Sequence, residues 1–374
     1  MKKVLILGTN AGQADIIEYF KELGWYVYSC GFKKTGPGVE LSDEFYLVDT
    51  TNIEDLVQLA KKLKVDVVYS VSSDTNITSA TKVSEILGLP ILVNSELINL
   101  FNKKDEFRCF LNSNEISTVD FITIDNINED NAKGLLWSVF PCVVKPVDSQ
   151  GQRGVQLVYK QEDLYSAVKE ASKWALDGKV IIEEFLDGAE ISTNIIVQNG
   201  KILINEFSDR IVFENDFFGL PKGHGVPVSY INKEQLELAQ SYVVKIVEKL
   251  NIIDAVLYIQ MKLKDGIPKI IEIAPRLDGC HIWRLLKAYK GFDLRLLAVK
   301  CLLGEPITES DLGNNYNKPA VLEFYHLPAN TKFDKTGFDV NDDVLYNEFR
   351  YHQGEEIVSI NGRLEVVGYC VYTK

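Results

Sequence analysis

The stretch PCVVKPVDSQGQRGV, residues 141–155, is the most informative part of the sequence. Its first half is an apolar strand with one lysine, Lys145, whose burial is costly unless the ammonium group has a partner. Its second half has two glycines that let a loop fold closely over phosphates, with backbone N–H groups as donors. It lacks the ending of a P-loop, so we expect a phosphate site of another kind. The alternative is a lysine that reaches solvent beside a plain hairpin. The residues of the predicted site are Lys145, Ser149, Gln150, Gly151 and Gly154.

Downstream, residues 180–190 read VIIEEFLDGAE, a strand that ends in two carboxylates followed by apolar residues and a further carboxylate. Backbone groups at such a strand end can pair with an adenine edge while Phe185 and Leu186 cover its face. Glu190 would suit ribose hydroxyls. Taken alone, the segment is better explained as a solvated acidic turn.

A second pattern lies in residues 256–273, where two strands flank the turn dipeptide Asp265-Gly266. Across this predicted hairpin Gln260 and Glu272 can face each other, and both offer oxygen, the ligand that Mg²⁺ prefers. Arg276 follows on the same strand face as a fixed-charge fork for a phosphoryl group or a carboxylate. The hairpin therefore predicts a metal site with an arginine beside it.

The first hundred residues alternate strand and helix signals. Strands are expected at 3–8, 26–30, 65–71 and 90–93, and helices at 13–23, 55–63 and 75–87. This rhythm is typical of a parallel sheet with helices on both faces. A single helix over 95–111 follows, broken by Asn112-Ser113-Asn114.

Paired strands dominate after residue 115. Hairpins are predicted around Asn199-Gly200, around Asp265-Gly266, and around Asn361-Gly362 between strands at 358–360 and 364–372. A long amphipathic helix is expected over 233–250. A linker is expected near 308–318.

Composition limits the function classes. The 374 residues predict two to three domains at roughly 150 residues each. With 46% hydrophobic and 25% charged residues the chain is an ordinary globular protein rather than a disordered one. A net charge of −13 makes nucleic acid and anionic membranes poor partners. No apolar run approaches the roughly 18 residues of a membrane span. Six dispersed cysteines without CxxC, and no signal-peptide core, lead us to expect a cytoplasmic protein without disulfides or zinc.

The early glycine cluster, Gly8 to Gly12, lies between a predicted strand and a predicted helix. Such a turn exposes backbone N–H groups that suit an anion, although it reads equally as an ordinary tight turn. It is not GxGxxG, and the next strand ends in Cys30 rather than an acidic residue, which disfavours a nicotinamide site. His224, in a glycine-flanked loop, and His281, at a helix start, could contact a ligand, but such histidines are more often merely exposed.

Together these elements resemble the ATP-grasp superfamily, closest to its carbamoyl-phosphate-synthase-like and L-amino-acid-ligase-like branch. The resemblance covers roughly residues 1–305 and rests on the order of the elements. It implies a fold class of α/β and α+β: an ATP-grasp fold preceded by a Rossmann-like domain, with a small β-rich C-terminal segment. The implied parts are a Rossmann-like domain (1–95), a linker helix (96–115), a small lobe (116–190), a large lobe (191–310) and a β-rich subdomain (315–374).

The resemblance also implies roles at the matching positions. Lys104, or Lys103 if the match shifts by one, would be the first lysine on ATP phosphate, and Lys145 the second. The loop from Ser149 to Gly154 would cover the phosphates. The implied adenine and ribose contacts are Glu183, Glu184, Phe185, Leu186 and Glu190.

The resemblance further implies that Gln260 and Glu272 hold Mg²⁺, with Mn²⁺ as a substitute, and that Arg276 lies beside the γ-phosphate and an acylphosphate. Many members have asparagine where this chain has Ala274, which leaves the number of metal ligands open, as does the neutral Gln260. The purine-pathway carboxylase that acts on aminoimidazole ribonucleotide is similar in having alanine there.

The implied function is a Mg-ATP-dependent carboxylate–amine ligase that forms an amide through an acylphosphate. The alternatives are an enzyme that makes carboxyphosphate from bicarbonate, and a decayed nucleotide-binding regulatory module. The partners of such a ligase would be a small-molecule carboxylate and a small-molecule amine. By analogy with this architecture, we expect a homodimer. Substrate contacts are expected from Asp74, Arg210, His224, Asp278, Gly279 and His281.

Overall fold

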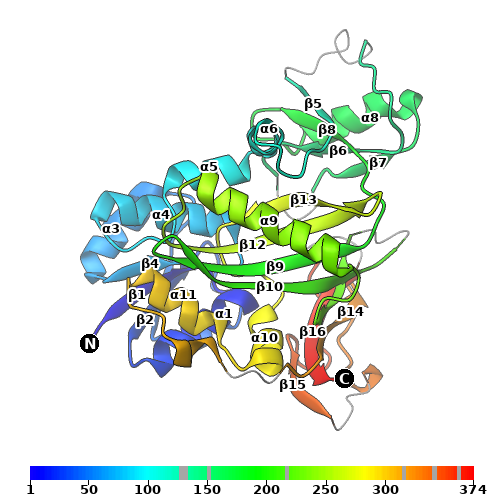
Figure 1. Cartoon of the computed structure of the whole chain (residues 1–374). Coiled ribbons are helices and arrows are strands. Elements are labelled where there is room, and N and C mark those ends of the chain that lie inside the picture. Colours follow the sequence, from blue (N-terminus) through cyan, green and yellow to red (C-terminus); the bar gives the residue numbers. More distant parts are fainter. Residues whose placement is uncertain (126–133, 150–152, 215–218, 314–316, 339–342, 360–363) are drawn as a thin grey trace.

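The computed structural model describes residues 1–125, 134–149, 153–214, 219–313, 317–338, 343–359 and 364–374. Three sheets organise these residues. A four-stranded parallel sheet near the N-terminus and a four-stranded antiparallel sheet flank a central eight-stranded sheet. In Figure 1 the parallel sheet lies at the left, the small antiparallel sheet at the upper right and the large sheet between them.

The parallel sheet has the order β3-β2-β1-β4. Its strands are β1 (Lys3–Leu7), β2 (Tyr26–Gly31), β3 (Glu44–Leu47) and β4 (Val67–Tyr69). Its helices are α1 (Ala11–Glu22), α2 (Gly38–Leu41), α3 (Ile53–Leu63) and α4 (Asp74–Leu87). Alternate residues of β1 belong to two different apolar clusters. Val4 and Ile6 lie in one cluster, and Leu5 and Leu7 lie in the other. Both faces are therefore buried, which explains the continuous apolar run.

Two helices, α5 (Ser95–Asn102) and α6 (Lys104–Ser113), connect the parallel sheet to the small antiparallel sheet. The small antiparallel sheet has the order β5-β8-β6-β7. Its strands are β5 (Phe121–Ile124), β6 (Cys142–Pro146), β7 (Gln156–Val158) and β8 (Val180–Glu184). The amphipathic helix α8 (Gln161–Ser172) packs its apolar side against this sheet through Leu164 and Val168.

The large sheet has the order β13-β12-β9-β10-β11-β14-β16-β15, and its described pairs are antiparallel. Its first five strands along the chain are β9 (Glu190–Gln198), β10 (Lys201–Val212), β11 (Pro221–Val226), β12 (Ala255–Lys264) and β13 (Ile267–Ala274). The others are β14 (Ala320–Pro328), β15 (Val344–Phe349) and β16 (Leu364–Thr373). The short 3₁₀ helices η2 (Glu309–Leu312) and η3 (Lys335–Gly337) lie in the connections. The C-terminal strands thus continue the large sheet through the β11–β14 pair.

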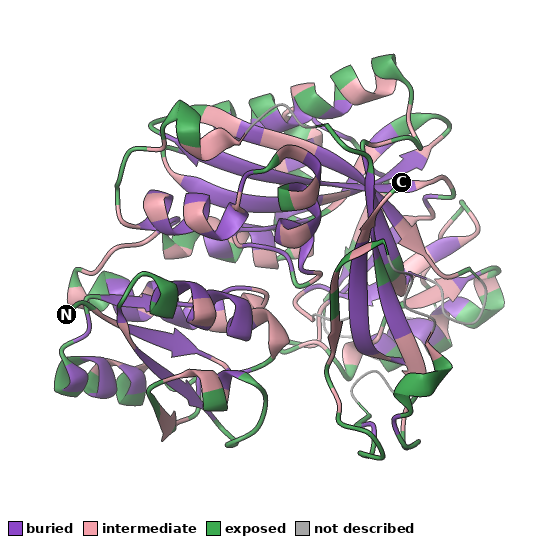
Figure 2. Ribbon diagram, turned by 90° about the horizontal axis from the view of Figure 1, so that it is seen from below, coloured by how far each residue is buried: buried purple, intermediate pink, exposed green. Residues whose placement is uncertain are grey.

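Helices cover both faces of the large sheet where it is widest. Helix α9 (Lys233–Lys249) packs on the face that carries Ile191 and Ile259. Helices α10 (Ile282–Lys290) and α11 (Leu294–Leu302) pack on the opposite face, as Figure 1 shows. Most strand residues in the middle of the sheet are consequently buried (Figure 2).

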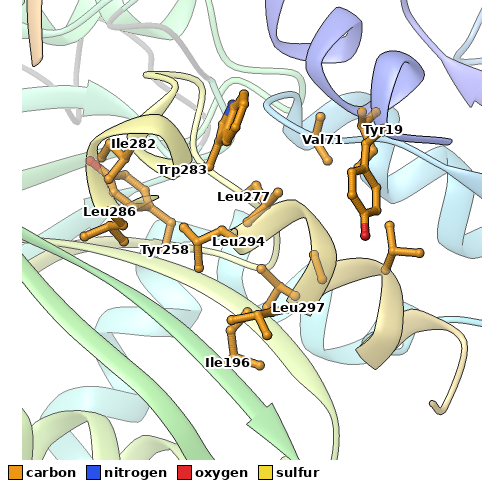
Figure 3. Close-up of a cluster of buried hydrophobic side chains, with 14 of the residues drawn as sticks. Tyr19, Val71, Ile196, Tyr258, Leu277, Ile282, Trp283, Leu286, Leu294 and Leu297 are labelled. Carbon is orange, nitrogen blue, oxygen red and sulfur yellow. The ribbon is translucent and has the colours of Figure 1, made fainter. Parts of the chain in front are cut away.

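The largest apolar cluster joins the N-terminal domain to the large sheet. Figure 3 shows Tyr19 of α1 and Val71 beside Leu294 and Leu297 of α11, with Ile196 of β9 below them. These side chains come from three parts of the sequence and share one core. The N-terminal domain is therefore held against α10 and α11 by continuous apolar packing.

Several sequence predictions are confirmed. The turns Asn199-Gly200 and Asp265-Gly266 each close a hairpin, β9–β10 and β12–β13. Strands β1, β2 and β4 and helices α1, α3 and α4 also form as expected, whereas β3 and α2 were not predicted.

All six cysteines are free. No helix in the described ranges combines the length and apolar character that crossing a bilayer requires.

Three predictions about elements are wrong. Residues 95–111 form two helices, because Lys103 is extended and the Lys104 backbone N–H donates to the Val147 carbonyl at 3.2 Å. Residues 90–93 form no strand, and Leu92 and Val93 instead enter two different cores. Strand β16 pairs with β14 and β15 rather than with a strand at Val358. The turn Asn361-Gly362 lies outside the described residues. The domain boundaries stay a prediction.

Candidate functional site

Two lysines lie together where α6 meets the small sheet. The Lys104 ammonium group donates to the carbonyls of Ser149 at 2.7 Å and Val147 at 3.2 Å. The Lys145 ammonium group, on β6, lies 2.5 Å from the Glu183 carboxylate of β8. Burial and the nearby Lys145 charge lower the pKa of Lys104 to about 8, against the opposing effect of Glu272 and Glu183. The two ammonium groups are thus held differently, Lys104 by carbonyl oxygens and Lys145 by a carboxylate.

Glu183 is a buried ion-pair residue. Its other carboxylate oxygen lies 2.7 Å from Nε of Arg108, one helical turn after Lys104 in α6. Burial alone would raise the pKa of Glu183, but Arg108 and Lys145 outweigh it and lower this pKa to about 2. Arg108 is the residue that sequence reasoning missed. The i, i+4 spacing from Lys104 was the one signal that placed both cations on a shared helix face.

The rest of the predicted adenine segment follows β8. The Glu184 side chain accepts from the Asp120 backbone N–H at 3.0 Å, and Leu186 is buried. The Lys262 ammonium group lies 5.3 Å from the ring centre of Phe185. In the glycine loop, Gln150 and Gly151 lie outside the described residues. Gly154 has a φ of +73°, and a Cβ there would lie 2.8 Å from Trp174, so this position requires glycine.

The predicted metal ligands lie directly opposite each other. Gln260 on β12 pairs with Glu272 on β13, and the register shifts immediately after this pair, so that Met261 opposes Ile270. Ile271 is the extra residue of the bulge. The Glu272 side chain is exposed, and its charge acts on Lys104. One carboxylate and one amide oxygen fit Mg²⁺, which typically takes one or two protein ligands and completes its shell with phosphates and water. No group of three or more His, Cys, Asp or Glu side chains that could hold a metal occurs in the part of the chain that the structure describes.

Arg276 connects β13 to the N-terminal domain. Its Nε donates to Asp74 Oδ1 at 2.5 Å, and Asp74 begins α4 at the carboxyl end of β4. The Ser72 backbone N–H donates to the Leu277 carbonyl at 3.3 Å. Ser72 also lies against Gly12, where a Cβ would clash with its hydroxyl. The strand order runs outward from β1 through β2 to β3 and then returns to β4 on the other side of β1, so the carboxyl ends of β1 and β4 mark a switch point, the usual place for a ligand in such sheets.

Asp278 and Gly279 follow Arg276 at this junction. The Asp278 carboxylate accepts the backbone N–H groups of Cys280 at 2.7 Å and Ile282 at 3.2 Å, and burial raises its pKa. An ideal Cβ on Gly279 would lie 3.6 Å from the Ser72 side chain. The structure thus brings Asp74, Arg276, Asp278 and Gly279 together at one junction, and their contacts with a substrate stay a prediction.

A second polar group lies on neighbouring strands of the large sheet. Glu190 on β9 pairs with Arg210 on β10 and with Lys262 on β12, the latter at 3.3 Å. His224 on β11 is opposite Arg210 and fully buried, with neither ring nitrogen bonded within the described residues. Burial and the Arg210 charge lower the pKa of His224 to about 3, so its ring is neutral near pH 7. Whether Glu190 contacts ribose stays a prediction.

His281 is enclosed rather than open. Its Nδ1 lies 2.6 Å from Asp15 Oδ2 of α1, and its ring stacks on Tyr369 with 4.3 Å between ring centres. Its Nε2 accepts from Arg350 at 3.1 Å. Asp15 also accepts from Trp283 Nε1 at 2.8 Å. Sequence reasoning found no sign of these contacts, which tie α1, α10 and the C-terminal strands to one imidazole.

Comparison with known proteins identifies the central part of the chain. The ATP-grasp domain family matches residues 138–283, which hold Lys145, Glu183, Gln260, Glu272 and Arg276. The chain contains an ATP-grasp domain. The expected fold, an ATP-grasp domain preceded by a Rossmann-like one, is confirmed.

The chain is similar to curated proteins in sequence and to solved structures in fold. It is 25% identical over 346 residues, 86% of its length, to the "carbamoyl phosphate synthase large chain, C-terminal section" of Methanocaldococcus jannaschii, and spans 54% of that protein. The L-amino acid ligase from Bacillus licheniformis superposes with a TM-score of 0.79 at 19% identity, covering 100% of this chain and 93% of that one. The biotin carboxylase domain of Hydrogenobacter thermophilus 2-oxoglutarate carboxylase was solved with MgADP and bicarbonate. It superposes with a TM-score of 0.79 at 17% identity, covering 100% of this chain and 86% of that one. The chain thus spans about half of the curated relative, and the two solved structures show the fold.

Proposed function

We propose that this chain is an ADP-forming carboxylate–amine ligase that uses Mg-ATP and small-molecule substrates. The observation that carries the proposal is that the charges of Lys145 and Glu272 both act on Lys104, while Glu272 faces Gln260 across a hairpin inside the ATP-grasp domain. Two cations beside a two-oxygen metal site suit a nucleotide polyphosphate, which needs charge neutralisation and a divalent ion.

The proposed reaction has two steps. A substrate carboxylate oxygen attacks the γ-phosphorus of ATP, and the bond to ADP breaks to leave an acylphosphate. The amine nitrogen then attacks the acyl carbon, phosphate leaves and the nitrogen gives up a proton, forming the amide. A bound Mg²⁺ would neutralise phosphate charge, with Gln260 and Glu272 as its protein ligands.

The side chains divide this work. Lys104 and Lys145 bind phosphate oxygens, and Arg276 is a fixed-charge fork for the carboxylate that becomes phosphorylated. In the structure the Asp74 carboxylate accepts a hydrogen bond from Arg276 Nε at 2.5 Å, as a substrate carboxylate would. The switch point of the parallel sheet supports substrate binding beside it. A homodimer in the cytoplasm is the proposed setting, as expected from the architecture and the cysteine pattern.

A second candidate is an enzyme that phosphorylates bicarbonate. It is favoured by the sequence relative named for carbamoyl phosphate synthase and by the solved biotin carboxylase domain that holds bicarbonate. Ala274, between Glu272 and Arg276, is also shared with the aminoimidazole-ribonucleotide carboxylase pattern. Bicarbonate would take the place of the substrate carboxylate, and the first step would yield carboxyphosphate.

One experiment separates these functions. ADP and phosphate release from Mg-ATP is measured against a panel of amino-acid pairs, with and without bicarbonate, using Lys145→Ala as the inactive control. Release that depends on amino acids supports the ligase. Release with bicarbonate alone supports the carboxyphosphate enzyme. ADP binding without turnover on any substrate would favour a regulatory module and contradict both.

A further inference from the structure

Arg108 is buried between the two halves of the ATP-grasp domain. It is 2% exposed and sits in α6, which belongs to neither sheet. Its guanidinium donates to Glu183 of the small sheet through Nε at 2.7 Å and through Nη2 at 3.5 Å. It also donates to two carbonyls of the large sheet, Ile270 through Nη1 and Ile271 through Nη2, the latter at 3.4 Å. A buried arginine needs such partners, and here they come from both lobes.

The large-sheet contacts fall on the bulge of β13. Ile271 is the residue without an opposite partner between the pairs Gln260–Glu272 and Met261–Ile270. An extra residue bends a strand and re-aims the side chains that follow it. Arg108 holds the carbonyls of both residues that precede Glu272. The Ser117 hydroxyl accepts the Ile270 N–H at 2.5 Å and holds the same residue from its other side.

The small-sheet contacts fall on the partner of Lys145. Glu183 accepts from Arg108 Nε through Oε1, whereas its Oε2 lies 2.5 Å from the Lys145 ammonium group and 3.5 Å from Arg108 Nη2. The carboxylate therefore cannot turn without breaking one of these contacts. Charge matters too: Lys145 and Glu183 alone sum to zero, whereas Arg108 leaves the trio with a net charge of +1. That surplus favours an incoming anion.

We infer that Arg108 is a positioning residue that aligns the phosphate lysine Lys145 on one lobe with the metal ligand Glu272 on the other. This inference rests on the proposed nucleotide site. Arg108 itself would contact neither the phosphate nor the metal ion. It acts on Lys145 through Glu183, and on Glu272 through the bulge of β13. Its planar fork serves both directions at once, which a lysine cannot do.

The test compares ADP affinity with and without Mg²⁺ by calorimetry in the full-length chain, so that no second substrate is needed. In Arg108→Lys, one cation can still pair with Glu183 but the bulge carbonyls lose their donors. We expect the factor by which Mg²⁺ strengthens ADP binding to fall by about tenfold or more, as for other residues that orient metal ligands. The matched control is Arg295→Lys. Arg295 is 4% exposed and paired with Asp293, away from this site, and its replacement should leave the factor unchanged.

The outcomes are distinct. A native protein that binds no ADP would overturn the nucleotide site and this inference with it. If native protein binds ADP but Arg108→Lys keeps the native Mg²⁺ factor while melting earlier, as Arg295→Lys does, Arg108 is merely structural and the inference fails. Should Arg108→Lys not fold, Ser117→Ala removes the other hold on Ile270. It should lower the Mg²⁺ factor while leaving metal-free ADP affinity unchanged; an unaltered factor would overturn the inference.

Discussion

Nucleotide affinity should fall with rising pH because of Lys104. Burial beside Lys145 lowers the pKa of Lys104 from 10.5 to about 8. A bound polyphosphate favours the charged ammonium group, so binding above pH 8 requires proton uptake. With a pKa of about 8 in the free protein, the protonated fraction is about nine-tenths at pH 7 and about one-tenth at pH 9. ADP affinity at saturating Mg²⁺ should therefore weaken about tenfold between these values, since the phosphates themselves are already ionised.

The assay is calorimetric titration with ADP at pH 7, 8 and 9. Lys104→Arg keeps its charge throughout this range and should flatten the profile. Lys103→Arg is the matched control, because Lys103 is exposed and paired with Glu106 at 2.6 Å. It should keep the native tenfold slope. A slope that survives in Lys104→Arg and disappears in Lys103→Arg would show that the neighbouring lysine binds phosphate; a slope unchanged in both would refute our account of Lys104.

Two further predictions concern the metal ligand and the domain junction. Glu272→Ala should raise the Mg²⁺ concentration for half-maximal turnover on the order of tenfold or more; an unchanged metal dependence would remove the β12–β13 hairpin from the metal site. Asp15→Ala leaves His281 Nδ1 and Trp283 Nε1 buried without their partner, at about 1–3 kcal/mol each. The free energy of unfolding should drop by about 2–6 kcal/mol in urea titrations, whereas Glu22→Ala, at an exposed position of the same helix, should change it little.

Local features of the fold could be predicted from the sequence. Asn199-Gly200 and Asp265-Gly266 determine their hairpins within a few residues. Counting back from the second turn would place Gln260 opposite Ile271, and it is the bulge at Ile271 that moves Glu272 into that position. The apolar run of β1 likewise indicates a strand buried on both faces. These predictions succeeded because turn chemistry and side-chain alternation act over short distances.

The parts that failed depend on distant residues. The expected single helix over 95–111 breaks because the Lys104 N–H bonds to Val147, which is 43 residues away. Arg108 was overlooked because its partners, Glu183 and Ile270, lie 75 and 162 residues further along the chain. No periodicity encodes such pairings. A single sequence shows that a cation lies on a helix, but only the fold shows what surrounds it.

The contacts that close the site also set an order of assembly. During synthesis the contact of Asp15 with His281 cannot form until 266 further residues have been made. The contact of Asp74 with Arg276 needs 202 further residues. At ribosomal rates this delay is on the order of ten seconds to a minute. During it the nascent parallel sheet can form, yet the side of α1 that later packs on α11 stays uncovered. That transient apolar face is where a chaperone would bind during synthesis, and where variants that slow translation or weaken α11 would aggregate.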